Sequence, residues 1–226
     1  MRQRFSVAID GPGGAGKGSA AKGVAEHYGI HYVDTGAIYR AVGLGVLRAG
    51  GEPGEREDVL RLLPGLSVEL RYDEAGAQHT LLNGEDVSGQ IRGEEISAAA
   101  SKVSALPQVR AFLLETQRRL AREDSVVMDG RDIGTVVLPE AEVKIFLTAR
   151  PETRARRRYL EQLAKGETVE YADVLEQLRQ RDERDMNRET APLRPAPDAV
   201  TVDNTDLDAA QTVAAICRVI DARIAQ

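Results

Sequence analysis

Short apolar runs recur along the chain, separated by longer stretches in which apolar residues return every three or four positions. The short runs cover residues 5–10, 30–33, 125–129, 141–148 and 199–203, and each is typical of a buried strand. The longer stretches are typical of helices that turn one face toward a core. Five strands separated by helices predict an α/β fold, in which helices flank a parallel five-stranded sheet with right-handed crossovers.

The predicted helices have recognisable ends. Thr35 carries a hydroxyl at the start of one helix, where it can cap the first turn. Pro107 interrupts a second helix, and Lys165 with Gly166 breaks a third. With these ends, the predicted helices are residues 20–28, a segment from 35 onward, 57–63, most of 91–120, two parts of 150–188, and 207–224.

One segment has a different pattern. Residues 66–72 alternate apolar and polar side chains, and residues 79–87 have the character of further strands around Asn83 and Gly84. An Asn-Gly pair favours a tight hairpin turn. We therefore expect a small antiparallel insert at about residues 64–90, within a chain whose 226 residues suffice for one domain with a full core.

The charge balance limits the class of ligand. The net charge of −6 argues against non-specific binding of nucleic acid, so an anionic ligand requires a local cluster of Arg and Lys. The single cysteine, Cys217, excludes an internal disulfide and fits buried packing, and the three histidines lack metal-ligand spacing. No apolar run reaches the roughly 18 residues of a membrane span, and no signal-type segment is present, so we expect a cytoplasmic protein that binds no membrane.

A glycine-rich turn joins the first predicted strand to the first predicted helix. Its residues are Gly11, Pro12, Gly13, Gly14, Ala15, Gly16, Lys17, Gly18 and Ser19. In this context, backbone N–H groups converge on phosphate oxygens, and the helix N-terminus adds positive potential. Lys17 can reach the terminal phosphates of a nucleotide. The sequence therefore predicts a phosphate-binding loop of the P-loop type.

The loop departs from the strict P-loop pattern at one position. Gly18 stands where Ser or Thr is expected, and Ser19 follows one position later. We therefore expect Mg²⁺ to be held largely through water and substrate oxygens, with Ser19 and Asp129 as the protein groups nearest to it. Asp129 ends a buried strand, as an acidic residue does in P-loop enzymes. A structural turn is the alternative for Asp129.

Two further stretches contain groups that can bind an anion or a base. Thr35 and Arg40 lie about one helical turn apart, where they can hold a second anion; a capped helix with a surface arginine is the alternative. Arg131 follows a buried strand, at the edge of the sheet where α/β proteins bind ligands. Asp132 would repel phosphate, so its ligand must offer a hydroxyl or amino donor.

Arginines also gather in the charged region 150–188. Two sets of residues in this region are spaced so that the members of each set share one helix face. These sets are Arg181, Asp185 and Arg188, and Arg154, Arg157 and Arg158. A solvated salt-bridge surface and a phosphate-clamping lid are both consistent with such spacing.

These motifs occur in the order and at the spacing of bacterial cytidylate kinases, a branch of the nucleoside monophosphate kinases, and the sequence resembles that family over nearly its whole length. The most discriminating stretch is 84–89, in the predicted insert, because adenylate and guanylate kinases lack it. Gly13 and Thr35 stand where the family often has Ser. The matching stretches are residues 9–12, 14–18, 36–40, 82–91, 129–132, 143–147, 181–185, 187–188 and 191–193.

The resemblance implies a monomeric enzyme that transfers the γ-phosphoryl group of ATP to CMP or dCMP in the presence of Mg²⁺. It implies one P-loop kinase domain over residues 1–226, divided into three regions. These regions are a core of residues 1–35, 120–150 and 189–226, a nucleoside-monophosphate-binding region of residues 36–119, and a lid of residues 151–188. The preference among CMP, dCMP and UMP stays open.

The resemblance also implies roles for single residues. Four residues would stabilise charge on the transferred group: Lys17, Arg131, Arg158 and Arg188. The acceptor's phosphate would be bound by Arg40 and Arg131, with the forked donors that suit phosphate oxygens. Base and sugar would be contacted by Thr35, Ser101, Arg110, Asp132, Arg181 and Asp185. The division between base and sugar stays open for Ser101, Arg110, Asp132, Arg181 and Asp185.

Three other functions are weaker. A GTPase-type switch needs an Asn/Thr-Lys-x-Asp element after a strand, and the sequence has none. A shikimate-kinase-like enzyme would not need the antiparallel insert or the pair Asp132 and Asp185. A non-catalytic nucleotide-binding module would have no use for Lys17 together with several phosphate-facing arginines. Another P-loop nucleoside monophosphate or small-molecule kinase is the remaining alternative.

Overall fold

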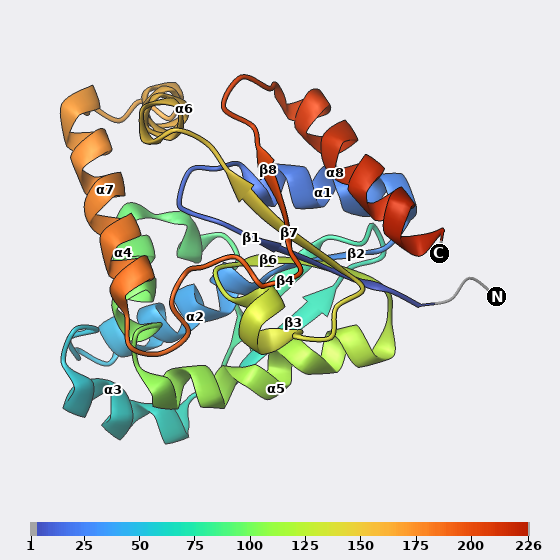
Figure 1. The fold of residues 1–226 in the computed structure, drawn as a ribbon. Helices are drawn as coiled ribbons and strands as arrows, with labels where there is room; N and C mark the ends of the chain where they lie inside the picture. The colour runs from blue at the N-terminus through green and yellow to red at the C-terminus, as the bar shows by residue number, and fades with distance from the viewer. Residues whose placement is uncertain (1–3, 226) are drawn as a thin grey trace. The chain divides into compact units, whose positions relative to one another are not determined.

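The computed structural model describes residues 4–225, whose helices and strands are drawn in Figure 1. These residues form two compact units. The first unit contains the described chain up to Ile30 and from Val126 onward, and the second contains His31–Ser125. The three-part division of the domain that the sequence suggests stays a prediction.

The first unit holds most of the parallel sheet and the helices that cover it. Its elements are β1 (Ser6–Asp10), α1 (Lys17–Tyr28), β6 (Val126–Gly130), the π-helical turn η3 (Ile133–Val137), β7 (Val143–Thr148), α6 (Pro151–Ala164), α7 (Tyr171–Asn187), β8 (Val200–Asp203) and α8 (Ala209–Ile224). The five-stranded sheet has the order β2-β6-β1-β7-β8, in which β2 is His31–Asp34. Its β1–β6, β1–β7 and β7–β8 pairs are parallel, which confirms the predicted fold class.

The central strand, β1, is apolar because it has a strand on either side and helices over the sheet. Its residues Val7, Ala8 and Ile9 are fully buried. Helices α1 and α8 lie side by side, and α8 also contacts β7 (Figure 1). On α8, Cys217 is buried next to Ile216, which confirms the packing role predicted for the thiol.

The second unit is built around the long helix α2. Its elements are β2 (His31–Asp34), α2 (Thr35–Arg48), α3 (Arg56–Leu62), the 3₁₀ turn η1 (Leu63–Gly65), β3 (Val68–Tyr72), β4 (Gln78–Leu82), β5 (Glu85–Asp86), the 3₁₀ turn η2 (Gln90–Arg92), α4 (Glu94–Val103) and α5 (Pro107–Glu123). Helix α2 contacts α4, β3 and β4. Strands β3, β4 and β5 form the predicted antiparallel sheet. Asn83 and Gly84 both have positive φ, 51° and 84°, as the predicted hairpin turn requires.

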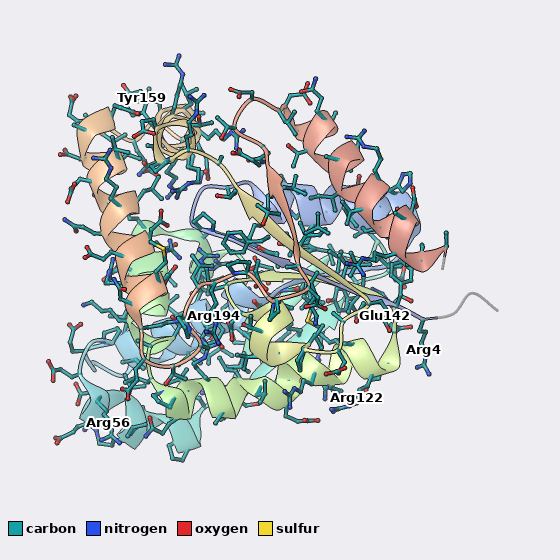
Figure 2. The ribbon with its side chains drawn as sticks, in the orientation of Figure 1. Arg4, Arg56, Arg122, Glu142, Tyr159 and Arg194 are labelled. Carbon is teal, nitrogen blue, oxygen red and sulfur yellow. The ribbon has the colours of Figure 1, made fainter. Side chains whose placement is uncertain are left out.

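Helices α6 and α7 form a pair in the charged region. The break predicted at Lys165 and Gly166 is confirmed, since α6 ends at Ala164 and α7 begins at Tyr171. A small apolar cluster joins the two helices: Ala155, Val174 and Leu178, with Tyr159, Val169 and Leu175 packed around them. Figure 2 labels Tyr159 on α6, and its ring meets that of Tyr171 edge to face, with centroids 6.1 Å apart.

Two helix starts differ from the prediction. The helix after the glycine-rich turn begins at Lys17, three residues before the predicted start at residue 20. Thr35 was predicted to cap α2, and this is wrong. Asp34 is the N-cap, because its carboxylate reaches the backbone N–H of Ala37, so Thr35 becomes the first helical residue. Within residues 4–225, no helix combines the length and the apolar character that crossing a bilayer requires.

Candidate active site

The glycine-rich turn connects β1 to α1 as a tight loop against β7. A Cβ atom at Gly11 would lie 2.0 Å from the carbonyl oxygen of Leu147, and φ at this position is 153°, so only glycine fits. Gly16, with φ of 84°, is the N-cap of α1 and has no side chain to occupy the helix end. The first N–H groups of α1 therefore keep their capacity to bind an anion.

Lys17 is buried at the start of α1, and its Nζ donates a 2.8 Å hydrogen bond to the carbonyl oxygen of Pro12. Burial and the nearby positive charge of Arg131 hold the pKa of Lys17 well below its usual range, while Asp129 acts in the opposite direction. An anion at the loop would supply the countercharge that the lysine needs. The loop and Lys17 are thus suited to binding phosphate.

Two arginine–aspartate pairs bring together acceptor-site candidates of the first unit. Nε of Arg131 donates to Oδ2 of Asp185 at 3.0 Å, and a terminal nitrogen of Arg188 lies 3.5 Å from Oδ1 of Asp132. Burial raises the pKa of Asp185, but the positive charges of three arginines outweigh it and hold that pKa below its ordinary value: Arg131, Arg181 and Arg188. This charged cluster can bind both an anion and a hydroxyl or amino donor.

Arg188 does not continue the helix face predicted for it. Helix α7 ends at Asn187, and Arg188 is the extended C-cap residue, with Nε bonded to the carbonyl oxygen of Ala191. Arg181 and Asp185 are both on α7, one turn apart, as predicted. The shared face therefore covers two of the three residues, and the turn after α7 positions the third.

Arg40 is the central anion-binding candidate of the second unit. It lies on α2 and pairs with the helix cap, since its terminal nitrogen is 2.7 Å from Oδ2 of Asp34. Arg92 reaches the same carboxylate oxygen at 3.2 Å. Two guanidinium groups thus converge on one carboxylate, and this arrangement is also the one that a phosphate group would need.

The candidate base-recognition residues Ser101 and Arg110 lie on neighbouring helices, α4 and α5. Arg110 is buried, packs over the ring of Tyr39 at 5.5 Å, and donates to the carbonyl oxygen of Ser104. The hydroxyl of Ser104 donates in turn to the carbonyl oxygen of Ser101. Thr35, the remaining candidate of this unit, is buried at the start of α2.

Comparison with known proteins identifies the family. A family model described as cytidylate kinase matches residues 7–222. The chain belongs to the cytidylate kinase family. Curated cytidylate kinases from Mycolicibacterium paratuberculosis and Geobacillus kaustophilus are 50% and 47% identical to it. These matches cover 94% and 99% of this chain and 93% and 100% of those proteins.

The fold is shared more widely than the family. A solved shikimate kinase from Acinetobacter baumannii, in complex with shikimate, is 14% identical, with a TM-score of 0.50 over 98% of this chain and 95% of that chain. At this identity the likeness concerns the fold alone. For the choice of substrate, the cytidylate kinase family match and the acceptor-site residues are the relevant observations.

The three arginines of α6 have different surroundings. Arg154 is buried, so the solvated alternative predicted for it is wrong. Arg157 donates to the carbonyl oxygens of Asn204 and Leu207. Arg158 pairs with Glu161 at 3.1 Å and keeps 29% of its side chain exposed. Of the three, Arg158 is the one whose surroundings fit a mobile phosphate contact.

Sequence reasoning missed two residues that fix the backbone beside candidate site residues. Asp10 ends β1 and accepts hydrogen bonds from the backbone N–H groups of Ile133 and Gly134 at 2.7 and 2.8 Å, which fixes the segment after Asp132. Gln78 of the insert bonds to both backbone groups of Asp34. An acidic residue directly before the glycine-rich turn was an available signal for Asp10. No signal in the sequence pointed to Gln78, because it bonds to the backbone of Asp34, which is 44 positions away in the sequence.

Proposed function

We propose that this chain transfers the γ-phosphoryl group of ATP to CMP or dCMP, giving ADP and CDP or dCDP. The observation that carries the proposal is the cytidylate kinase family match from residue 7 to residue 222, because this range includes both the phosphate loop and all of the acceptor-site candidates. The identity of about half to curated cytidylate kinases over nearly the whole chain supports the same activity.

On the donor side, the loop backbone and Lys17 hold the phosphates of ATP in this proposal. The transition state of phosphoryl transfer spreads negative charge over oxygens, so the protein contributes mainly by positioning and by electrostatics. Mg²⁺, when bound, would neutralise phosphate charge. Ser19 and Asp129 provide oxygen ligands of the kind that Mg²⁺ prefers, and the charge of Asp129 acts on Lys17. These two residues would hold the ion, Asp129 through water.

On the acceptor side, Arg40 and Arg131 bind the monophosphate in this proposal. Thr35, Ser101, Arg110 and Asp132 recognise the base and nearby groups, while Arg181 and Asp185 contact the sugar. Carboxylates accept hydrogen bonds from amino and hydroxyl groups, and guanidinium groups donate to the O2 and N3 acceptors of cytosine. The contacts among Arg131, Asp132, Asp185 and Arg188 support a shared role for these four.

The chemistry needs no general base. The acceptor is a phosphate whose second pKa is about 6, so it is already ionised at neutral pH. Arg131, Arg158 and Arg188 would neutralise charge on the transferred group, and closure of the helices within residues 151–188 would exclude water and suppress hydrolysis of ATP. Arg158 supports this role because it is partly exposed and has a surface partner.

The test is a coupled assay of ADP release with Mg²⁺-ATP and one acceptor at a time. We expect strong turnover with CMP and dCMP, and weak turnover with UMP. Turnover with AMP, GMP or shikimate in place of CMP would keep the phosphate loop and overturn the acceptor assignment. No acceptor-dependent ADP release at all would overturn the proposed activity.

A further inference from the structure

A buried ion pair attaches the phosphate loop to the helix pair α6–α7. Arg154, in the first turn of α6, directs three donors to three different acceptors. Its Nε donates to the carbonyl oxygen of Ala149 at 2.9 Å, one terminal nitrogen donates to that of Gly13 at 2.8 Å, and the other lies 2.7 Å from Oδ2 of Asp182. One side chain thus connects the loop, the end of β7 and the helix α7.

The loop packs closely at this junction. A Cβ atom at Gly14 would lie 3.1 Å from Cβ of Arg154, and one at Gly13 would lie 3.3 Å from Leu178 of α7. The position of the loop relative to α7 is therefore fixed both by contact and by the Arg154 fork. The same helix carries Arg181 and Asp185, and Asp182 lies between them in sequence.

Stability alone does not account for this pair. The side chains of Arg154 and Asp182 are only 4% and 10% exposed, so both charges have lost their hydration. Oδ1 of Asp182 is buried with no hydrogen-bond partner within residues 4–225. Desolvation can exceed the Coulomb gain of a buried pair, and an unsatisfied oxygen adds to the cost. The geometry is better explained by a requirement for a defined position.

We propose that Arg154 and Asp182 are positioning residues: they set the distance between the loop that holds the donor phosphates and the face of α7 that carries Arg181 and Asp185. This inference rests on the proposed kinase function. Each of the three guanidinium nitrogens of Arg154 contacts a protein oxygen, so we assign the residue no contact with a reacting atom. It acts through the Gly13 carbonyl on one side and through Asp182 on the other.

Arg154→Lys is the most informative variant. A lysine keeps the buried charge beside Asp182, but its donors all lie on one nitrogen, so it cannot reproduce contacts that Arg154 makes through three separate nitrogens. The measurement is the single-turnover rate constant for phosphoryl transfer from ATP to CMP, which does not depend on the folded fraction. We expect this rate constant to fall about 10- to 100-fold, as misplacement of reacting groups by about 1 Å does. A purely structural role would lower the amplitude and leave the rate constant unchanged, and that result would overturn the proposal.

The same two helices provide a matched control. Arg179 of α7 pairs with Glu152 of α6 at 3.1 Å, but both side chains are more than half exposed. Glu152→Gln and Arg179→Lys should leave the rate constant within about twofold, as expected for a surface pair. If they slow transfer as much as Arg154→Lys does, helix docking in general is responsible and the loop contact is not.

A second variant covers the case in which Arg154→Lys fails to fold. Asp182→Asn keeps the shape and one acceptor oxygen, and it removes only the charge. Its rate constant should fall at least severalfold, and a wild-type rate constant in folded Asp182→Asn would contradict the proposal. If wild-type protein itself shows no transfer to any acceptor, the proposed function has failed instead, so the two failures are distinguishable.

Discussion

Lys17 shows how the surroundings of a single residue suit it to an anionic ligand. Its ammonium group is buried and bonded to the carbonyl oxygen of Pro12. Burial disfavours its charged form, and a phosphate anion would favour it. The Lys17 ammonium group is therefore held inside the loop by the Pro12 carbonyl and by the charges of Asp129 and Asp10, and phosphate oxygens would add acceptors.

Replacing this lysine tests the loop directly. In Lys17→Ala, we expect kcat to fall by two or more orders of magnitude, because the donor phosphates lose their charged partner, while the circular dichroism spectrum stays native. Lys22, exposed on the same helix α1, provides the control, and Lys22→Ala should keep wild-type kcat. Unchanged turnover in Lys17→Ala would contradict a role for the loop in catalysis.

Asp185 tests the acceptor side at the same scale. It is paired with Arg131, and its carboxylate is kept ionised by three arginines. In Asp185→Ala, we expect KM for CMP and dCMP to rise at least tenfold, because the sugar loses an acceptor and Arg131 loses its partner. Steady-state kinetics with both substrates measure this. The control is Asp173→Ala, at an exposed position of the same helix, which should keep wild-type kinetic constants. Wild-type constants in Asp185→Ala would exclude the role assigned to Asp185.

At the scale of elements, the sequence pattern predicted which helices and strands exist better than it predicted the residues at which they begin and end. The apolar runs that became β1 and β6 are clear because these strands are buried on both faces, whereas β7 buries Val143, Ile145 and Leu147 and leaves the alternate residues partly exposed. The start of α1 was missed by three residues, since the phosphate-binding turn continues directly into the helix at Lys17. The cap of α2 was misplaced because Asp34 and Thr35 are both good capping residues, and only geometry decides between them.

The antiparallel insert contains a titratable link of its own. Nδ1 of His79, on β4, lies 2.6 Å from Oδ2 of Asp86, and Nε2 lies 3.3 Å from Oδ2 of Asp73. Hydrogen bonds to these two carboxylates raise the pKa of His79 above its ordinary 6.5. The histidine therefore stabilises the insert fully below pH 6.5, and this contribution is lost as the pH rises through the raised pKa.

The insert should accordingly loosen in mild alkali. We expect amide protection factors in β3 and β4 to fall between pH 6 and pH 8.5, after correction for intrinsic exchange. In His79→Gln, protection should be lower at pH 6 and should not change over this range. An identical slope in the wild type and in His79→Gln would show that another group is responsible.

At the scale of the whole molecule, the sheet order was beyond the reach of the sequence. The strands resemble one another as apolar runs, so the pattern predicts that they pair but does not distinguish β2-β6-β1-β7-β8 from other orders. The candidate site likewise contains some residues that the sequence reveals and others that only the fold reveals. Lys17 and Arg131 lie in local motifs, whereas Arg154 and Asp10 bind carbonyl or N–H groups more than 100 positions away.

Asp10 links this long-range packing to global stability. Burial raises its pKa from 3.8 to about 6, so between these values the folded chain holds a proton that the unfolded chain has released. Its contribution to the free energy of unfolding therefore falls as the pH rises from 3.8 to about 6, and it is constant above that value.

Urea unfolding of wild-type protein and Asp10→Asn measures this contribution. The free energy of unfolding of the wild type, relative to that of Asp10→Asn, should fall as the pH rises from 4 to 6, by at most about 1.4 kcal/mol per pH unit. The difference should be flat from pH 6.5 to pH 8. A difference that does not vary with pH would mean that Asp10 titrates as an exposed carboxyl does.

The burial of Cys217 also has a practical consequence. Burial raises the pKa of this thiol, the one cysteine in the chain, and shields it, so thiol-reactive dyes should modify it slowly in the native protein. A cysteine introduced at the exposed Lys165, between α6 and α7, would then be the preferred labelling position, and Cys217 would not need to be replaced. Fluorescence from a dye at that position would follow movement of the helix pair during a catalytic cycle.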